Sequence, residues 1–239
     1  MLDERLKVGT HPRLDAFHAA LLDIPTQQLA EPGIHLVATE RRARPGWGGY
    51  IAPVLAIATS RGGLVSSRDD LFPAVSRETA NFSPGRPLGE REFARLRSVS
   101  QRAVPYAYCL SGDVLFADQA RFRPHPVTAE RLLRDDRRGN DLRKRFDGEV
   151  FIVSGSRDDI AAWAAIKLKS DDVWEIAVVT EPQYRGRGFA KRVVSSATEY
   201  ILNQGRVPLY VHDRANLASA RVCRSLGYTE YAQTFFCEY

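Results

Sequence analysis

The chain has 239 residues, of which 44% are hydrophobic and 26% are charged, and its net charge at pH 7 is +5. This composition is ordinary for a water-soluble globular protein, and the length allows one large or two modest domains with a substantial core. No apolar run is long enough to cross a bilayer, which argues against a membrane protein. The first ten residues carry charges where a signal peptide needs its apolar region, so a cytoplasmic location is expected.

The three cysteines, Cys109, Cys223 and Cys237, are few and contain no CxxC pair. Such a set argues against a disulfide framework and against a zinc site, so no metal is expected. The positive net charge favours anionic ligands in general, and a phosphate-rich cofactor would satisfy it as well as nucleic acid would.

Residues 1–126 show a mixed α/β pattern without a recognisable catalytic motif. Helices are predicted for 11–22, for a segment that begins at Ser67 as N-cap, and for 90–99, and the expected strands are 33–40, 49–60, 64–66 and 106–116. Residues 83–87 read as a loop. This region is either a degenerate second copy of the C-terminal unit or a separate acceptor-binding domain.

The segment from Thr128 to Arg145 is dense in charge and is predicted to begin a helix with Thr128 as its N-cap. One hypothesis is a basic patch that binds nucleic acid. The other is a solvated connector whose arginines pair with neighbouring aspartates. The second is favoured, because no aromatic residues alternate with the charges to stack on bases. A domain boundary is expected near the start of this segment, giving domains 1–126 and 127–239.

From Gly148 onward the pattern becomes regular. A hairpin of strands 149–154 and 160–169 around a turn at 155–158 precedes a strand at 174–179. A helix from Phe189, a strand at 208–212, a helix from Asn216 to Leu226 and a strand at 228–236 follow.

The segment from Trp174 to Tyr200 joins a buried strand to an amphipathic helix through the sequence Arg185-Gly186-Arg187-Gly188. A glycine-rich turn at a helix N-terminus presents free backbone N–H groups to an anion. The segment therefore predicts a phosphate site.

Three kinds of glycine loop were compared with this segment. A P-loop is excluded, because the chain contains no GxxxxGK[ST] string. A dinucleotide-binding loop fits poorly, because Lys191 stands where the third glycine is needed and the turn after Thr180 is too long.

The third kind fits. The sequence from Gln183 to Ala190, QYRGRGFA, resembles the [QR]xxGx[GA] motif of the GNAT acyltransferase superfamily, which binds coenzyme A. Glu175 on the preceding strand is similar to the glutamate of that family's central strand. Asn216, followed by LASARVCRSLGY, is similar to the family's second coenzyme-contacting segment. The resemblance covers residues 149–239.

The resemblance implies a mixed, mostly antiparallel sheet flanked by helices, with acetyl-CoA as co-substrate. In the family, the strand before the loop splays from its neighbour and its free backbone pairs with the pantetheine arm. The residues that the resemblance assigns to coenzyme binding are Val178, Val179 and Thr180, then Arg185, Gly186, Arg187, Gly188, Phe189 and Ala190, and finally Asn216 and Ser219.

Glu175 is the predicted general base, since acyl transfer to an amine requires that the amine lose a proton. Its apolar strand is expected to raise the pKa of its carboxyl. The competing interpretation is a structural glutamate that pairs with a basic side chain. The family's usual acid, a tyrosine, corresponds to Cys223, which is either a thiol acid for the leaving group or a small core residue.

The sequence thus predicts an N-acetyltransferase in which an amine attacks acetyl-CoA directly in a ternary complex. The expected partner is a small-molecule or peptide amine, with no nucleic acid and no membrane, and a homodimer stays open. The alternative is a non-catalytic acyl-CoA-binding or regulatory module, which the missing tyrosine supports.

Overall fold

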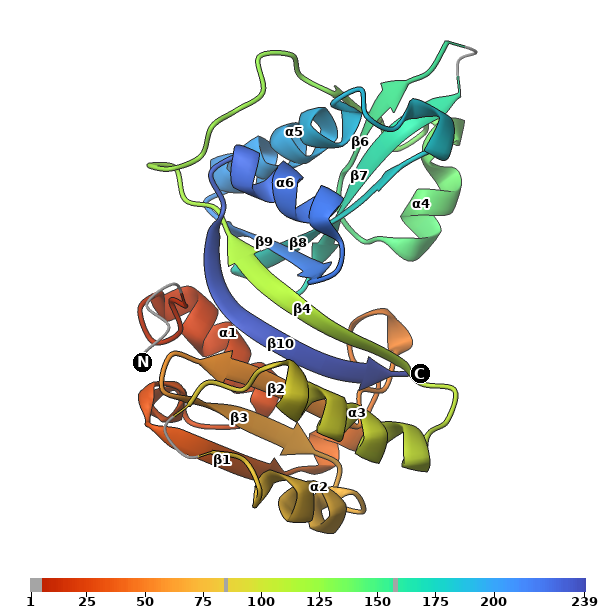
Figure 1. The fold of residues 1–239 in the computed structure, drawn as a ribbon. Helices are drawn as coiled ribbons and strands as arrows, with labels where there is room; N and C mark the ends of the chain where they lie inside the picture. The colour runs from red at the N-terminus through yellow and green to blue at the C-terminus, as the bar shows by residue number, and fades with distance from the viewer. Residues whose placement is uncertain (1–5, 84–85, 157–158) are drawn as a thin grey trace. The chain divides into compact units, whose positions relative to one another are not determined.

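The computed structural model describes residues 6–83, 86–156 and 159–239, and it divides the chain into two compact units (Figure 1). Unit 1 comprises the chain up to Val114 together with Glu230–Tyr239, and unit 2 is Leu115–Thr229. This division differs from the predicted domains 1–126 and 127–239, because the last strand returns to the first unit. The predicted loop at 83–87 and the predicted turn at 155–158 lie partly outside the described residues.

Unit 1 is a sheet with helices on both faces. Its strands lie in the order β1-β3-β2-β10-β4, namely β1 (Gly33–Ala38), β3 (Gly62–Ser67), β2 (Val54–Thr59), β10 (Thr229–Glu238) and β4 (Tyr108–Phe116). β1 and β3 are parallel, whereas β2 is antiparallel to both β3 and β10. Short 3-10 turns occur at η1 (Thr26–Ala30), η2 (Glu40–Ala43) and η3 (Trp47–Gly49).

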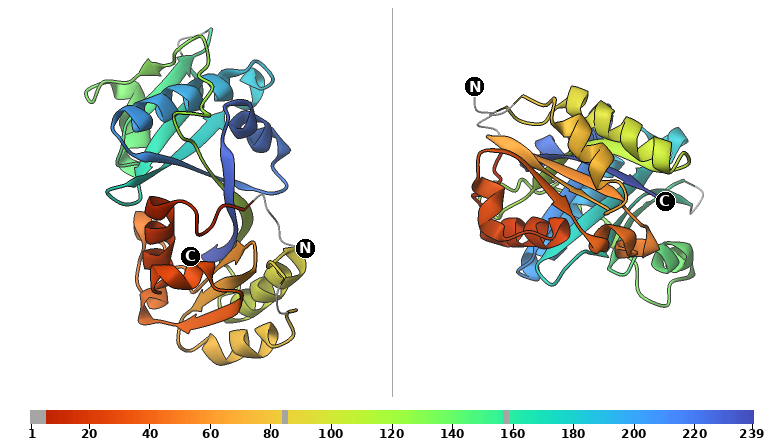
Figure 2. Two further views of the ribbon diagram at one scale, coloured as in Figure 1. Left: turned by 90° about the vertical axis from the view of Figure 1, so that its left-hand side faces the viewer. Right: turned by 90° about the horizontal axis from the view of Figure 1, so that it is seen from below.

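The helices of unit 1 are α1 (Pro12–Leu22), α2 (Phe72–Thr79) and α3 (Glu90–Ala103). Figure 2 shows α1 on one face of the strands and α2 and α3 on the other. α3 begins where predicted, because the Glu92 carboxylate accepts a hydrogen bond from the Gly89 N–H at 2.9 Å. α1 is tied to β10 by buried Asp15, whose Oδ1 accepts from the Tyr231 hydroxyl at 2.7 Å.

The prediction that Ser67 caps a helix is wrong. Ser67 is the last residue of β3, where it is paired with Val54. The sheet ladder satisfies its backbone, and α2 begins instead at Phe72, with a proline in its first turn.

The inference against disulfides also needs correction, because Cys109 and Cys237 form one. They lie on the neighbouring strands β4 and β10, 128 residues apart in sequence. A separation of this size leaves no local sequence pattern, so the pairing is visible only in the folded chain.

Unit 2 contains the predicted site. Its strands lie in the order β9-β8-β7-β6-β5, namely β9 (Val207–Asp213), β8 (Val173–Thr180), β7 (Ile160–Leu168), β6 (Val150–Ser154) and β5 (Glu130–Arg131). The pairs from β5 to β8 are antiparallel, and β8 and β9 are parallel. The expected fold class, a mixed and mostly antiparallel sheet flanked by helices, is confirmed.

The remaining elements of unit 2 are α4 (Asn140–Arg145), α5 (Phe189–Asn203), α6 (Leu217–Ser225), η4 (Arg137–Gly139) and η5 (Pro182–Tyr184). Figure 1 shows α5 and α4 on opposite faces of β6 and β7. The core lies between the sheet and α5, and its fully buried residues include Ile166, Val193, Val194 and Ala197.

The segment from Thr128 to Arg145 does not begin with a helix, contrary to the prediction. Its first part forms β5, which pairs with β6, and the helix α4 comes only after η4. Its charges are paired as the connector hypothesis expects: Arg138 lies 2.7 Å from Asp136, and Lys144 lies 3.0 Å from Asp141.

Candidate active site

Strands β8 and β9 separate partway along their length. Their parallel ladder ends at Glu175 on β8 and Leu209 on β9. β8 nevertheless stays paired with β7 as far as Thr180. Beyond Glu175, the edge of β8 that faces β9 therefore has no strand partner within the described part of the chain. Val178, Val179 and Thr180, the residues predicted to meet the pantetheine arm, lie on this unpaired stretch.

The glycine loop follows β8 and opens α5. Gly186 and Gly188 have φ angles of 77° and 78°, a region in which a side chain would be strained. A Cβ placed on either residue would meet no heavy atom within 4 Å, so the space beside the backbone is open. The first i to i−4 hydrogen bond of α5 runs from the Arg192 N–H to the Gly188 carbonyl at 3.2 Å. The amides of residues 189–191 therefore have no acceptor within the helix.

The two arginines of the loop are exposed and differ in their contacts. Arg185 donates through Nε to the Thr180 carbonyl at 3.3 Å. The Arg187 guanidinium lies 5.6 Å from the centre of the Tyr184 ring. Tyr184 is itself buried and bonds through its hydroxyl to the Asp159 carboxylate at 2.8 Å. The loop is thus a positively charged, anchored turn at a helix N-terminus, which suits an anion.

The second predicted segment starts α6. Asn216 is the N-cap, and its Oδ1 accepts a hydrogen bond from the Ser219 N–H at 3.0 Å. The Ser219 hydroxyl lies 2.8 Å from the Tyr210 hydroxyl. Burial raises the pKa of Tyr210 to about 12, so this phenol stays protonated at neutral pH. Both predicted residues therefore meet at the start of α6, where Asn216 orders the first turn.

Glu175 lies at the point where β8 and β9 separate. Its side chain is 13% exposed, and Oε1 is 2.6 Å from Lys167 Nζ on β7, while Oε2 is 3.6 Å from Lys169 Nζ. Burial alone would raise the pKa of this carboxyl, but the charges of Lys169 and Lys167 outweigh it and hold the pKa below the ordinary value. The expectation of a raised pKa is therefore wrong.

The lysines beside Glu175 were not predicted as members of the site. The competing interpretation expected a pair with a basic side chain, and the structure shows two such pairs, with Lys167 of β7 and with Lys169 directly after β7. The alternation of Ile166, Lys167, Leu168 and Lys169 was the signal, because residues two apart lie on one face of a strand.

Cys223, the predicted alternative acid, is fully buried in the core of unit 2. Its thiol lies 3.2 Å from the Ala220 carbonyl, an i to i−3 contact typical of a helix interior. Tyr228 is buried nearby, with its hydroxyl 2.7 Å from that of Thr198, and burial raises the pKa of this phenol. Both side chains therefore pack in the core of unit 2. The acid role of Cys223 stays a prediction, and the burial of its thiol does not support it.

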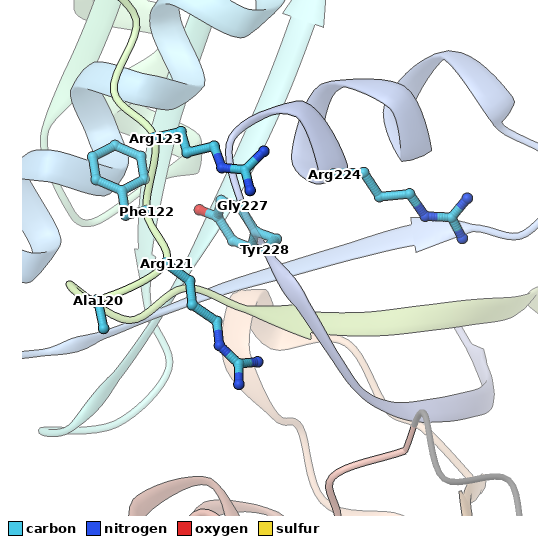
Figure 3. Close-up of a pocket in the computed structure, with 7 residues that line it drawn as sticks. All are labelled: Ala120, Arg121, Phe122, Arg123, Arg224, Gly227 and Tyr228. Atoms are coloured by element: carbon cyan, nitrogen blue, oxygen red, sulfur yellow. The ribbon is translucent and has the colours of Figure 1, made fainter.

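A cavity of about 430 Å³ lies elsewhere in unit 2, between the chain after β4 and the end of α6. Its lining includes Arg121, Arg123 and Arg224, whose guanidinium groups extend in different directions (Figure 3). None of the residues that line it belongs to the predicted site.

A comparison with protein families identifies the C-terminal region. Residues 152–237 match the model of the family described as FR47-like protein. This family is GNAT-like, so the match confirms the predicted resemblance of the C-terminal region to GNAT acyltransferases. The matched residues include the glycine loop, Glu175 and the start of α6. No curated protein matches the chain.

Several solved structures match part of the chain at low sequence identity. A protein described as a GNAT-family acetyltransferase from Novosphingobium aromaticivorans is 21% identical, with a TM-score of 0.46 over 55% of this chain and 65% of its own. A GNAT-family acetyltransferase from Colwellia psychrerythraea is 13% identical, with a TM-score of 0.44 over 61% of this chain and 62% of its own. A protein described as a GCN5-related N-acetyltransferase from Kribbella flavida is 18% identical, with a TM-score of 0.44 over 60% of this chain and 63% of its own. The matched parts thus span less than two thirds of each of these proteins.

No helix in the described ranges is both long and apolar enough to cross a bilayer. No group of three or more histidine, cysteine, aspartate or glutamate side chains that could hold a metal ion occurs in the same ranges.

Proposed function

We propose that the chain is an acyl-CoA-dependent N-acyltransferase that transfers the acetyl group of acetyl-CoA to an amine. The observation that carries this proposal is the separation of β8 from β9 at Glu175, directly before a glycine loop that opens α5. This arrangement provides a place for each part of the coenzyme. The thioester of acetyl-CoA supplies the activated acyl group.

The residues present fit coenzyme A. The amides at the start of α5, the positive-φ glycines and the exposed Arg185 and Arg187 suit its pyrophosphate. At residues 178–180 the edge of β8 that faces β9 has no strand partner among the described residues, and this edge suits the amides of the pantetheine arm. Asn216 and Ser219, at the start of the neighbouring helix, complete the proposed coenzyme site.

Glu175 is proposed as the general base that takes the proton from the acceptor amine. Ile176 faces α5, and the neighbouring Glu175 therefore faces the opposite side of the sheet. A coenzyme that enters the gap from the α5 side would therefore have to reach through the gap for its thioester to approach the carboxylate. The lysine pair keeps Glu175 ionised at neutral pH, which is the form that accepts a proton.

The source of the proton for the departing thiolate is assigned to solvent. Cys223 has no exposed surface, and the Tyr228 hydroxyl is engaged with Thr198. A buried acid without access to the gap cannot deliver a proton to it.

Thiol release from acetyl-CoA in the presence of a panel of amines tests the proposal. We expect turnover with at least one amine, and a loss of about 100-fold to 10,000-fold in kcat for Glu175→Gln, the range for a general base. Glu199→Gln, an exposed glutamate on α5, is the matched control and should keep full activity.

Three results would contradict different parts of the proposal. If coenzyme A does not bind the wild-type protein, the coenzyme site is wrong. If it binds but no amine is acetylated, the non-catalytic acyl-CoA-binding module is the correct reading. An unchanged rate for Glu175→Gln would remove the assigned base and leave the fold and the site intact.

A further inference from the structure

His212 lies on β9 beyond the point where β9 separates from β8. It is three residues past Leu209, the last residue of the ladder, and only 4% of its surface is exposed. Its ring lies 6.2 Å from that of Tyr210, two residues earlier on the same face of the strand. Tyr210 packs in the core with α5 and α6, so His212 faces the same side as those helices.

The hydrogen bonds of His212 leave one ring nitrogen unused. Nδ1 lies 2.9 Å from the Asp213 carbonyl, which can only accept, so Nδ1 carries the hydrogen. In the neutral imidazole, Nε2 is then an acceptor. Nε2 is buried and has no hydrogen-bond partner among the described residues.

Thr180, on the facing strand β8, also has a buried polar atom without a hydrogen-bond partner among the described residues. Its Oγ1 is buried without a hydrogen-bond partner in the described part of the chain. Ile176 and Val178 on β8 pack against the core that contains α5, and the alternation of the strand places Thr180 on that face as well. The two unsatisfied groups thus lie on one face of two diverging strands.

Unsatisfied polar groups in protein interiors are costly and rare, so two on one face of one gap require an explanation. Since the gap opens toward the start of α5, a ligand that enters it would supply the missing partners. The available acceptor is a neutral nitrogen, which suits an N–H or O–H donor better than a phosphate oxygen.

We propose that His212 and Thr180 bind the pantetheine arm of coenzyme A through their side chains. His212 Nε2 accepts a hydrogen bond from an amide N–H of the arm, and the Thr180 hydroxyl bonds to an amide of the same arm. This inference rests on the proposed function and deepens it: the arm is recognised by two side chains as well as by the strand backbone. His212 is thus a positioning residue and takes no part in the proton transfers.

Calorimetric titration with two probes tests the inference. Coenzyme A contains the arm, whereas adenosine 3′,5′-bisphosphate reproduces the nucleotide end without it. His212→Asn keeps a donor at the position of Nδ1 and removes Nε2, and Thr180→Val keeps the shape of the side chain. We expect each variant to bind coenzyme A about fivefold to tenfold more weakly, as for the loss of one hydrogen bond, and the bisphosphate unchanged.

Ser66→Ala is the matched control. It removes another buried hydroxyl without a partner among the described residues, on β3 of unit 1, and should leave both affinities unchanged. Equal losses for the two probes, or coenzyme A affinities within twofold of wild type in both variants, would overturn the inference. So would a fall in kcat of His212→Asn with unchanged coenzyme affinity, since that result assigns His212 to the chemistry. Failure of the wild type to bind coenzyme A would instead refute the proposed function.

Discussion

At the scale of single residues, the two lysines around Glu175 decide how this carboxylate behaves. An acidic residue inside an apolar strand led us to expect a raised pKa. In the folded chain, Lys167 Nζ lies 2.6 Å from the carboxylate, and attraction of opposite charges outweighs the cost of burial. Glu175 is thus held in its charged form by Lys167 of β7 and by Lys169, which directly follows that strand.

This pairing predicts the direction of a pH effect. The lowered pKa of Glu175 should place the acidic limb of the kcat/KM profile below the ordinary carboxyl range, because a base is active only when ionised. Lys167→Met removes a positive charge and a hydrogen bond, so the pKa rises and the limb should move to higher pH. Profiles of wild type and variant, recorded with one amine, measure the shift.

The control for this prediction is Lys144→Met. Lys144 is exposed and pairs with Asp141 on α4, so its loss should leave the profile in place. A limb that does not move in Lys167→Met would mean that the pH dependence belongs to a group other than Glu175.

At the scale of elements, the turn from β8 into α5 was the part of the site most accessible from sequence. Gly186 and Gly188 adopt positive φ, as two glycines at a helix start suggest, and Asn216 caps α6 as predicted. These signals are local, since each depends on a few consecutive residues. The separation of β8 from β9 was expected only from the resemblance, because it depends on residues far apart along the chain, such as Glu175 and Leu209.

The glycine loop gives a prediction with a control on the same helix. Gly188→Asp adds a strained side chain and a negative charge beside the proposed pyrophosphate site, so coenzyme A should bind more than about tenfold more weakly. Gly205, at the other end of α5, also has a positive φ and open space, and Gly205→Asp should carry a similar backbone strain. Its coenzyme affinity should stay at the wild-type level. Equal affinity of the two variants would show that the loop is not the pyrophosphate site.

At the scale of the whole molecule, unit 1 is discontinuous in sequence. Its strand β10 comes from the end of the chain and lies between β2 and β4. The Cys109–Cys237 disulfide joins β10 to β4 within this unit. The stability of unit 1 therefore depends on residues that the sequence pattern assigned to the other domain.

Removing the disulfide should destabilise unit 1. A cross-link across 128 residues restricts the unfolded chain, and its loss costs about 2–4 kcal/mol in comparable cases. Urea unfolding of wild type with and without dithiothreitol, beside the double variant Cys109→Ala and Cys237→Ala, measures the effect. Reductant should lower the wild type to the level of the variant and leave the variant unchanged. A wild-type midpoint that is insensitive to reductant would contradict a stabilising role.

The sequence by itself determined the succession of strands and helices from Gly148 onward, the glycine loop and the cap of α6. Hydrophobic periodicity, glycine at positive φ and side-chain capping all act between near neighbours, so they can be read from a few residues. The helix expected to begin at Ser67 is not formed there, because a long-range contact decides the structure at this residue. Pairing of Ser67 with Val54 of β2 overrides the local capping signal.

Only the tertiary structure decided which distant residues meet. The lysines that set the charge state of Glu175, the buried unpartnered atoms of Thr180 and His212, and the disulfide of unit 1 all depend on strand pairing across the chain. Such contacts follow from the register and order of the strands, which are settled by burying whole faces of the sheet at once. For this reason the position of the proposed phosphate site could be predicted from the sequence, whereas the contacts around Glu175 could not.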